Sequence, residues 1–294
     1  MSALSGFFAV VGRPNVGKST LVNALVGTKV AITSSRPQTT RNTIRGVLTL
    51  SEPQRQFIFV DTPGLHKPKN SLGERLNRLV YGSLAEVDGA LFLVDATKKI
   101  GPGDRLIAKR LAQSDLPVVL VVNKTDIAKP DQVISQLQVA GEWDFHAYVP
   151  VSALKESGMT PIIEELTPLL TDGPLFFPVD MVTDQPDFLW AGELVREKFL
   201  RRLHEELPHS LAVLVEEIET RPNGLVAVSA TVFVERKSQK GIVIGKGGAL
   251  LRDVGREARA DLERMFGAKV FLDLRVKVEP DWQRKDASLD RLGF

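Results

Sequence analysis

The stretch GRPNVGKST, residues 12–20, determines the expected fold of the first half of this chain. It follows an apolar run and opens a stretch with helical spacing, and it matches the phosphate-loop pattern G-x-x-x-x-G-K-[ST]. The first N–H groups of a helix lack intrahelical partners and carry the positive end of its dipole, so such a loop binds phosphate. We expect Lys18 to contact the β and γ phosphates during catalysis and the Ser19 hydroxyl to bind Mg²⁺. The residues expected to bind a nucleotide here are Gly12, Arg13, Pro14, Asn15, Val16, Gly17, Lys18, Ser19 and Thr20.

Short apolar runs alternate with helical patterns around this loop. Six runs rich in Val, Ile, Leu and Phe are expected to be strands: Phe7–Val11, Ile44–Leu50, Phe57–Asp61, Ala90–Asp95, Val118–Asn123 and Ala147–Val151. Continuous apolar runs suit a sheet that is covered on both faces. Their alternation with helices predicts a doubly wound α/β domain, which we place at residues 1–172.

The motif NKTD, residues 123–126, indicates which base the nucleotide carries. The Asp126 carboxylate can accept hydrogen bonds from N1–H and the 2-amino group of guanine, two donors that adenine lacks there. An adenine would leave that carboxylate desolvated and unpaired. We expect Asn123 to brace the pocket, the Lys124 stem to cover one face of the ring, and Ser152 and Ala153 to complete it, with the Ala153 N–H reaching the 6-oxo group.

Two segments between these motifs are expected to sense the terminal phosphate. The sequence DTPGL, residues 61–65, ends a strand, so Asp61 is expected to hold Mg²⁺ through water and the Gly64 N–H to reach the γ-phosphate. Upstream, Thr40 is preferred over Thr39 as a further Mg²⁺ ligand with a catalytic role. The residues added to the nucleotide site are Asp61, Thr62, Pro63, Gly64 and Leu65.

The pattern changes after residue 172. Prolines, a glycine and several aspartates predict a linker over 173–187. Residues 188–281 show the element order α-β-β-α-α-β, which predicts a small α+β domain, and 282–294 form a tail. Charge is segregated here: 180–235 carries 5 basic and 11 acidic residues, whereas 236–277 carries 11 basic and 5 acidic residues. Such segregation can create a basic face.

A second glycine loop, Gly245-Lys246-Gly247-Gly248, lies in the basic segment and matches the G-x-x-G loop of KH domains. Its spacing does not fit a second phosphate loop. A structural helix–helix turn is the usual explanation of such a loop, but the element order and the positive charge favour binding of single-stranded RNA. The residues expected to contact RNA are Ile242, Ile244, Gly245, Lys246, Gly247, Gly248, Arg252 and Arg256.

Taken together, the chain resembles the Era family of bacterial GTPases with a C-terminal type II KH domain. The resemblance rests on GRPNVGKST, PQTTR, DTPGLH, NKTD, VSA, FLWAGELVREK, VERKSQKGIVIGKGG and the closing RLGF. It implies GTP hydrolysis with Mg²⁺, a role in maturing the small (30S) ribosomal subunit, and binding of the 3′ end of its ribosomal RNA. It also implies a cytoplasmic protein that associates loosely with the cell membrane, and we expect no DNA partner.

The attacking water lacks its usual orienting side chain in this sequence. Many GTPases place a glutamine after the Asp-x-x-Gly motif, where this chain has the apolar Leu65. Our hypothesis is that Asn15 helps to bind K⁺ beside the phosphates, as in the potassium-dependent GTPases that it resembles. The competing interpretation is that Asn15 only shapes the loop and a ribosomal partner accelerates the reaction.

Composition limits the alternatives. The chain has no cysteine and no apolar run near the roughly 20 residues that span a bilayer. An RNA-modifying enzyme would need a second catalytic cluster, for which the last domain offers His204 and His209 alone. The other alternative is a GTP-regulated scaffold at the membrane, with the amphipathic stretch LVREKFLRRLHEEL, residues 194–207, at the interface.

Overall fold

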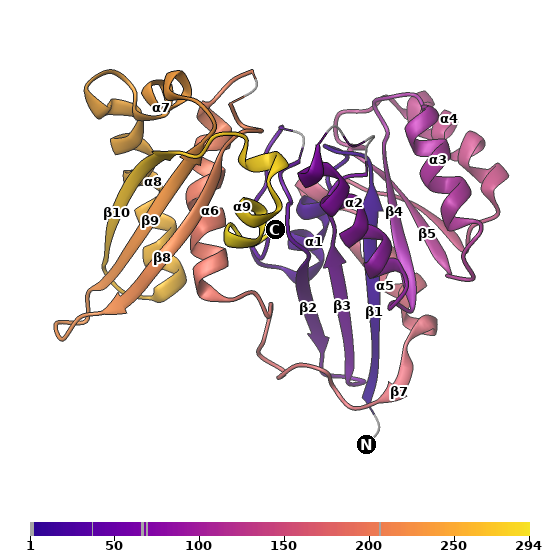
Figure 1. Cartoon of the computed structure of the whole chain (residues 1–294). Helices are drawn as coiled ribbons and strands as arrows, with labels where there is room; N and C mark the ends of the chain where they lie inside the picture. Colours follow the sequence, from indigo (N-terminus) through magenta and orange to yellow (C-terminus); the bar gives the residue numbers. More distant parts are fainter. Residues whose placement is uncertain (1–2, 37, 66–67, 69, 206) are drawn as a thin grey trace. The chain divides into compact units, whose positions relative to one another are not determined.

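The chain forms two compact units, one made of most of residues 1–184 and the other mainly of 185–294. The structure is a computed structural model, and it describes residues 3–36, 38–65, 68, 70–205 and 207–294 (Figure 1). Pro37 of the PQTTR motif and His66 of DTPGLH lie outside the described residues.

The first unit is built on one sheet. Its described strands are β1 (Ala3–Gly12), β2 (Ile44–Leu50), β3 (Arg55–Asp61), β4 (Gly89–Asp95), β5 (Val118–Asn123), β6 (Ala147–Pro150) and β7 (Thr171–Gly173). They lie in the order β2-β3-β1-β4-β5-β6, and β7 pairs with β1. The β2–β3 and β1–β7 pairs are antiparallel and the others are parallel. All six strands expected from the sequence are confirmed.

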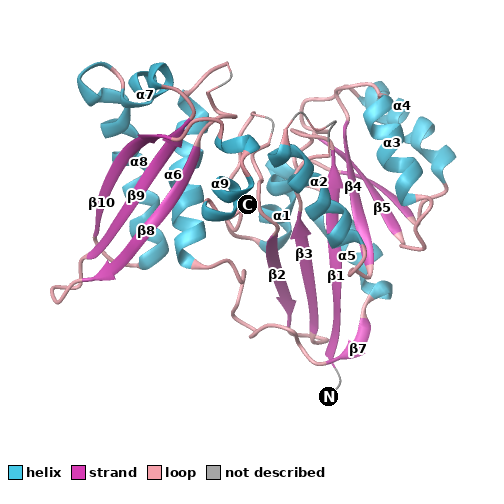
Figure 2. Ribbon diagram, viewed as in Figure 1, coloured by secondary structure: helices cyan, strands magenta, loops and turns pink. Residues whose placement is uncertain are grey.

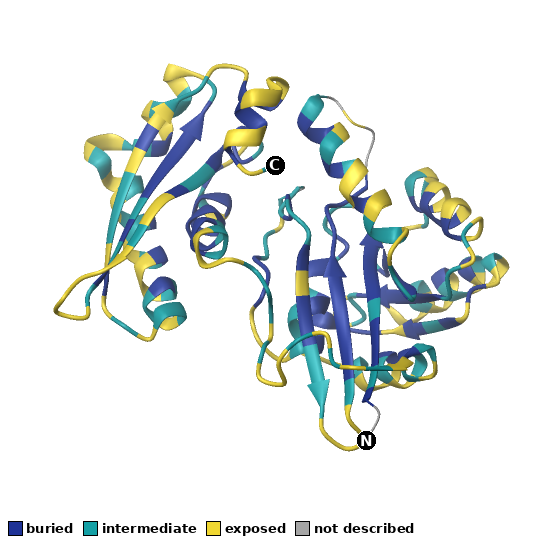
Figure 3. Ribbon diagram, turned by 60° about the horizontal axis from the view of Figure 1, so that its bottom comes forward, coloured by how far each residue is buried: buried dark blue, intermediate teal, exposed yellow. Residues whose placement is uncertain are grey.

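Helices cover both faces of this sheet, as the continuous apolar runs predict. They are α1 (Lys18–Val26), α2 (Ser71–Leu84), α3 (Pro102–Leu111), α4 (Pro130–Ala140) and α5 (Met159–Leu166). Apolar residues of α1 and α5 form one core with the sheet, and those of α2, α3 and α4 form the other. The sheet is accordingly buried while the outer helix surfaces are exposed (Figure 3). The doubly wound fold places the carboxyl ends of β1, β3, β4 and β5 at one edge, where such folds bind ligands.

The stretch predicted as a linker is partly attached to this first unit. Its first residue, Gly173, is the last residue of β7. The backbone N–H groups of Phe176 and Phe177 donate to Gln56 Oε1 at 2.9 and 3.0 Å. The Val47 N–H donates to the Val182 carbonyl at 2.9 Å, and Arg45 pairs with Asp184. We call residues 171–184 the strap, because hydrogen bonds hold it against β1, β2 and β3.

The second unit has the predicted α-β-β-α-α-β order (Figure 2). Its elements are α6 (Asp187–Arg202), β8 (Ala212–Thr220), β9 (Val226–Val234), α7 (Lys237–Ile244), α8 (Ala249–Phe266), β10 (Val270–Val278) and α9 (Asp286–Arg291). The sheet order is β10-β9-β8, with β9 antiparallel to β8 and parallel to β10. A parallel pair needs a long crossover, which α7 and α8 provide. Buried residues of α6, α7 and α8 pack with this sheet. The α/β fold expected of the first domain and the α+β fold expected of the second are both confirmed.

Candidate functional site

The first glycine loop joins the end of β1 to the start of α1. Gly17 adopts φ +103°, and a Cβ there would lie 2.2 Å from the Asn123 Nδ2 atom, so only glycine fits. Lys18 is buried, and its Nζ atom donates to the carbonyls of Gly12 and Arg13 at 3.3 and 3.2 Å. Burial lowers the pKa of Lys18 to about 8, although the nearby Asp61 charge opposes this shift. The ammonium therefore lies inside the loop that is expected to hold phosphate.

Three oxygen-bearing side chains meet beside this loop. The Ser19 and Thr40 hydroxyls donate to Asp61 Oδ2 at 2.7 and 3.1 Å, and the two hydroxyl oxygens lie 2.8 Å apart. Asp61 is fully buried, and among the described residues its Oδ1 atom has no hydrogen-bond partner. Burial raises the pKa of Asp61, against the opposing influence of Lys18 and both hydroxyls. A buried, incompletely paired carboxylate next to two hydroxyls is a donor set that fits Mg²⁺.

The segment after β3 packs closely on the phosphate loop. A Cβ at Gly64 would lie 2.8 Å from the Pro14 Cα atom, so this glycine permits the contact. The Leu65 N–H donates to the Gly12 carbonyl at 3.2 Å, and the Leu65 side chain packs in the hydrophobic core. Leu65 and Thr62, whose hydroxyl donates to the Val10 carbonyl, therefore support the loop rather than offer side chains to a nucleotide. Val16, also named from the sequence, has its side chain in the core, and Pro63 is buried.

The expected base pocket is assembled by hydrogen bonds between motifs. Asn123 donates to the Val16 carbonyl at 2.9 Å, and its Oδ1 atom accepts from the Lys124 and Ala153 N–H groups. Asp126 is exposed and accepts a 2.7 Å hydrogen bond from the Ser152 hydroxyl. The Ala153 N–H was expected to contact the 6-oxo group of guanine, whereas here it donates to Asn123 at 3.0 Å. The structure thus brings all five residues together but uses the Ala153 N–H to brace Asn123.

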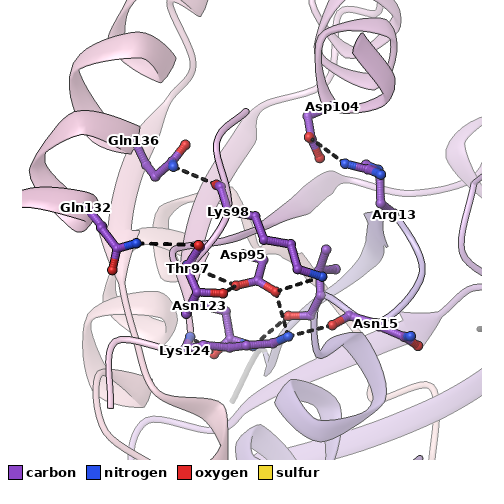
Figure 4. Close-up of polar contacts among 11 residues, drawn as sticks. Arg13, Asn15, Asp95, Thr97, Lys98, Asp104, Asn123, Lys124, Gln132 and Gln136 are labelled. Carbon is purple, nitrogen blue, oxygen red and sulfur yellow. Dashed lines mark hydrogen bonds and ion pairs between the residues drawn. The ribbon is translucent and has the colours of Figure 1, made fainter. Parts of the chain in front are cut away.

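Asp95, at the end of β4, is a residue that sequence reasoning missed (Figure 4). Its Oδ2 atom accepts from Lys124 Nζ at 2.7 Å, while the same ammonium donates to the Asn15 carbonyl at 2.8 Å. The Thr97 N–H and hydroxyl both donate to Asp95 Oδ1. Burial works to raise the pKa of Asp95, but the hydrogen bonds from Lys124 and Thr97 outweigh it and hold the pKa below its ordinary value.

A sequence signal for Asp95 does exist. It ends the strand that pairs with the NKTD strand, in register with Asn123. Its carboxylate ties the base motif to the phosphate loop through one lysine.

Two further residues of the phosphate loop were also named from the sequence. Arg13 pairs with Asp104 at 3.2 Å, and the backbone of Asn15 adopts φ +64°.

The second glycine loop connects α7 and α8. Gly245, Gly247 and Gly248 have φ of +76°, +59° and +76°, and no atom lies within 4 Å of a Cβ added at Gly247. Lys246 is exposed. The Arg252 guanidinium donates to the Gly247 carbonyl at 2.9 Å, so this arginine holds the loop from the first turns of α8. The loop is therefore open at Gly247, and its two cations are the exposed Lys246 and the Arg252 guanidinium that binds the Gly247 carbonyl.

The residues predicted to flank this loop do not all share one environment. Ile242 is 54% exposed, whereas Ile244 is partly buried against the core of the unit, because the helix turns it inward. Arg256 pairs with Asp253 at 2.9 Å. A groove of about 500 Å³ begins at Gly248 and lies between α8 and β10. The structure thus places an apolar, arginine-lined groove directly beside the loop.

Comparisons with known proteins agree with the folds of both units. Residues 7–124 match the family model described as 50S ribosome-binding GTPase, and residues 206–283 match that of the KH domain. The chain is 46% identical to GTPase Era of Alkaliphilus metalliredigens over 299 residues, covering 100% of each protein. It is 47% identical to GTPase Era of Carboxydothermus hydrogenoformans over 302 residues, covering 100% of this chain and 99% of that protein. This chain belongs to the Era family of GTPases.

Solved Era structures have the same fold over the whole chain. One is Era in complex with MgGDPNP and nucleotides 1506–1542 of 16S ribosomal RNA, with 37% identity, a TM-score of 0.95 and 99% of each chain covered. Another is a variant of Aquifex aeolicus Era bound to GDP and AlF4⁻, with 38% identity, a TM-score of 0.95 and 99% coverage of each chain. The resemblance seen in the sequence is confirmed: the chain is an Era GTPase with a KH domain. No helix among its described residues is long and apolar enough to cross a membrane.

Proposed function

We propose that this chain binds and hydrolyses GTP at the first loop and binds the single-stranded 3′ end of small-subunit ribosomal RNA at the second, during assembly of the small ribosomal subunit. One observation carries the proposal. The Ser19 and Thr40 hydroxyls both donate to the buried Asp61 carboxylate, beside the buried Lys18 ammonium. The Era relative crystallised with MgGDPNP and 16S ribosomal RNA supports both ligands.

In this proposal the chain's own groups position the triphosphate. The N–H groups at the start of α1 and the Lys18 ammonium neutralise phosphate oxygens, which is most of what phosphoryl transfer requires of a protein. Ser19, Thr40 and Asp61 would hold Mg²⁺, which would supply further charge neutralisation to the phosphates when bound. The Gly64 backbone lies against Pro14 of the phosphate loop, and in this proposal its N–H contacts the terminal phosphate.

The base is selected by Asp126, which Ser152 orients. In this proposal its carboxylate accepts from guanine N1–H and the 2-amino group, while Asn123 ties the pocket to the phosphate loop. Lys124 lies between the Asn15 carbonyl and Asp95, which leaves its stem to cover the ring. The Ala153 N–H contributes through Asn123 in the geometry described above.

Hydrolysis is tested by measuring phosphate release from GTP with Mg²⁺. We expect turnover in the wild type, loss of nucleotide affinity in Lys18→Ala, and weaker Mg²⁺ binding in Asp61→Asn, seen as a higher Mg²⁺ concentration for half-maximal turnover. Wild-type turnover of ATP equal to that of GTP would contradict the assigned pocket.

The potassium hypothesis for Asn15 stays a prediction. Leu65 packs in the core, so its side chain does not orient water. Measuring turnover in K⁺ and in Na⁺ at matched ionic strength tests the hypothesis, and a faster rate in K⁺ that is lost in Asn15→Ala is expected. Equal rates in the two salts remove it.

RNA binding is tested by titrating an oligoribonucleotide of the ribosomal 3′ end against the wild type and Gly247→Asp. Position 247 is open and Asp tolerates positive φ, so the variant is expected to fold. The added carboxylate repels phosphate, and we expect binding to be lost. Peripheral membrane association, the alternative considered from the sequence, stays a prediction; vesicle flotation without RNA is its test.

A further inference from the structure

The strap displays large apolar side chains to solvent. Phe176, Val179 and Val182, which follow one another at every third position, are 55%, 57% and 40% exposed. Val179 occupies the tip of a turn, in which the Met181 N–H donates to the Pro178 carbonyl at 3.0 Å. Single exposed apolar residues are ordinary, whereas a group of them marks an interaction surface. We call the three exposed side chains the strap patch.

The fold uses the backbone of the strap and not the side chains of the strap patch. The Phe176 N–H donates to Gln56 and the Val182 carbonyl accepts from the Val47 N–H. The Phe176 ring contacts Phe7 edge to face, with 4.9 Å between the ring centroids, yet more than half of its surface stays exposed. Hydrogen bonds thus fix the strap against the sheet of the first unit (Figure 1). A surface that is ordered before binding loses little conformational entropy when a partner binds.

The charge around the strap patch is negative. Residues 156–195 contain no lysine and no arginine. Asp184 pairs with Arg45, whereas Asp180 is exposed and forms no ion pair with any described residue. Asp180 directly follows Val179 in the turn, so an unpaired carboxylate adjoins the apolar side chains. The strap therefore combines apolar groups with uncompensated negative charge.

This combination selects the chemistry of the partner. RNA phosphates and anionic lipid headgroups repel a carboxylate, so neither an RNA strand nor a membrane surface fits the strap. A protein segment that carries lysine or arginine next to apolar side chains complements the strap in both charge and hydrophobicity. Proteins that bind RNA carry such basic segments, and the small ribosomal subunit is RNA with proteins bound to it.

We propose that the strap is a docking site for a basic, apolar segment of a protein of the small ribosomal subunit. The proposal rests on the function proposed above and adds a protein partner to the RNA. Phe176 and Val179 form the centre of the contact, because the core of a protein interface is apolar and its rim is polar. Asp180 pairs with a lysine or arginine of the partner at the rim.

The first test measures the sign of a charge change. The full-length wild type, Asp180→Lys and Asp131→Lys are titrated against purified small ribosomal subunits. Asp131 is an exposed residue of α4, so both variants change the net charge equally. We expect Asp180→Lys to bind about tenfold more weakly than Asp131→Lys, because a lysine repels a basic partner. Equal or tighter binding by Asp180→Lys overturns the proposal, since the same change would strengthen a contact with RNA.

The second test removes part of the apolar centre. Val179→Ser is expected to weaken binding to the subunits about fivefold, because less apolar surface is buried. Ile134→Ser, at a similarly exposed position of α4, should bind as the wild type does. Both side chains are exposed, so the melting temperature, GDP affinity and affinity for free 3′-end RNA of both variants should match those of the wild type. Unchanged subunit binding by Val179→Ser overturns the role of the strap patch.

A photo-cross-linker identifies what covers the strap. Benzoylphenylalanine in place of Phe176, in the full chain bound to the same subunits, should yield a product with a lysine- or arginine-rich protein segment, identified by mass spectrometry. Products with ribosomal RNA, with residues 185–294 of the same chain or with a second copy overturn the proposal, as does a bound complex that yields no product. Failure of the wild type to bind the subunits is a different result, because it removes the function proposed above as well.

Discussion

At the scale of single residues, Asp95 connects the two halves of the nucleotide site. One ammonium, that of Lys124, reaches both the Asp95 carboxylate and the Asn15 carbonyl, while Thr97 fixes the other carboxylate oxygen. Asp95 itself is expected to touch no nucleotide. It is a positioning residue, because its carboxylate orients the lysine that contacts the phosphate loop.

We predict that Asp95→Asn weakens GDP binding about tenfold, since a charge-assisted hydrogen bond to Lys124 is lost. The measurement is a double-mutant cycle of GDP affinity with Lys124→Met. The two changes should be non-additive, because both break the same contact. Asp131→Asn, at an exposed aspartate of α4, is the matched control and should bind GDP normally. Additive effects would contradict a shared role.

The pH dependence of this contact has a defined sign. The folded pKa of Asp95 lies below its ordinary value, so its stabilising contribution is complete above the unfolded pKa and is lost as pH falls through the folded one. The difference in unfolding free energy between the wild type and Asp95→Asn should therefore stay constant from pH 7 to about pH 5 and shrink below about pH 4. Denaturant titrations at these pH values measure it; a difference that already shrinks between pH 7 and 5 would contradict the shift.

Base selectivity is assigned to the Asp126 carboxylate. We predict that Asp126→Asn weakens GTP and improves xanthosine triphosphate, because the 2-oxo group of xanthine needs a donor that an amide supplies. Competition between the two nucleotides for one fluorescent analogue gives the ratio directly. A variant that still prefers GTP would show that another group reads the base.

At the scale of elements, the strap depends on one buried glutamine. Gln56 is fully buried in β3, and its Nε2 atom donates to the Thr49 hydroxyl and the Phe177 carbonyl. Its Oε1 atom accepts from two successive backbone N–H groups of the strap. A single side chain thus satisfies three backbone groups of a segment that has little regular structure of its own.

We predict that Gln56→Leu lowers the free energy of unfolding by about 2 kcal/mol, because backbone groups of the strap lose their partners. Hydrogen exchange at residues 176 and 177 should accelerate. Thr49→Val removes one bond of the glutamine without touching the strap, so exchange there should stay slow. Unchanged exchange in Gln56→Leu would mean that other contacts hold the segment.

The strap also illustrates what the sequence does and does not predict. Phe57–Asp61 and Ala90–Asp95 could be assigned because continuous apolar runs of that length report a buried strand. The strap could not, since its prolines and aspartates are typical of a linker and its attachment to Gln56 depends on a partner 120 residues away. Distant pairings leave no local pattern.

The same distinction applies to the sites. Motif spacing was sufficient to predict Ser19, Thr40 and Asp61 as one cluster, because Ser19 lies at the start of α1, Asp61 ends β3, and Thr40 lies in the loop before β2, whose first residue pairs with Asp61. It did not predict that the Ala153 N–H binds Asn123 or that Arg252 holds the second loop. Those contacts depend on side-chain conformations that only the folded chain defines.

At the scale of the whole molecule, two units carry two anion sites of different chemistry. The first encloses Lys18 and Asp61, both buried, as suits a small ligand that is held and released. The second presents exposed cations along an open groove within the basic segment 236–277, as suits a polymer whose backbone continues beyond the protein. The described residues named for each site all belong to one unit.

The most direct test of this division is one set of titrations of labelled GDP and labelled ribosomal 3′-end RNA at fixed salt. The wild type, Lys18→Ala and Gly247→Asp are compared. We predict that Lys18→Ala loses GDP and keeps RNA in the nucleotide-free state, whereas Gly247→Asp loses RNA and keeps GDP. If Gly247→Asp bound RNA like the wild type, or if Lys18→Ala alone abolished RNA binding, the assignment of one polyanion to each glycine loop would be contradicted.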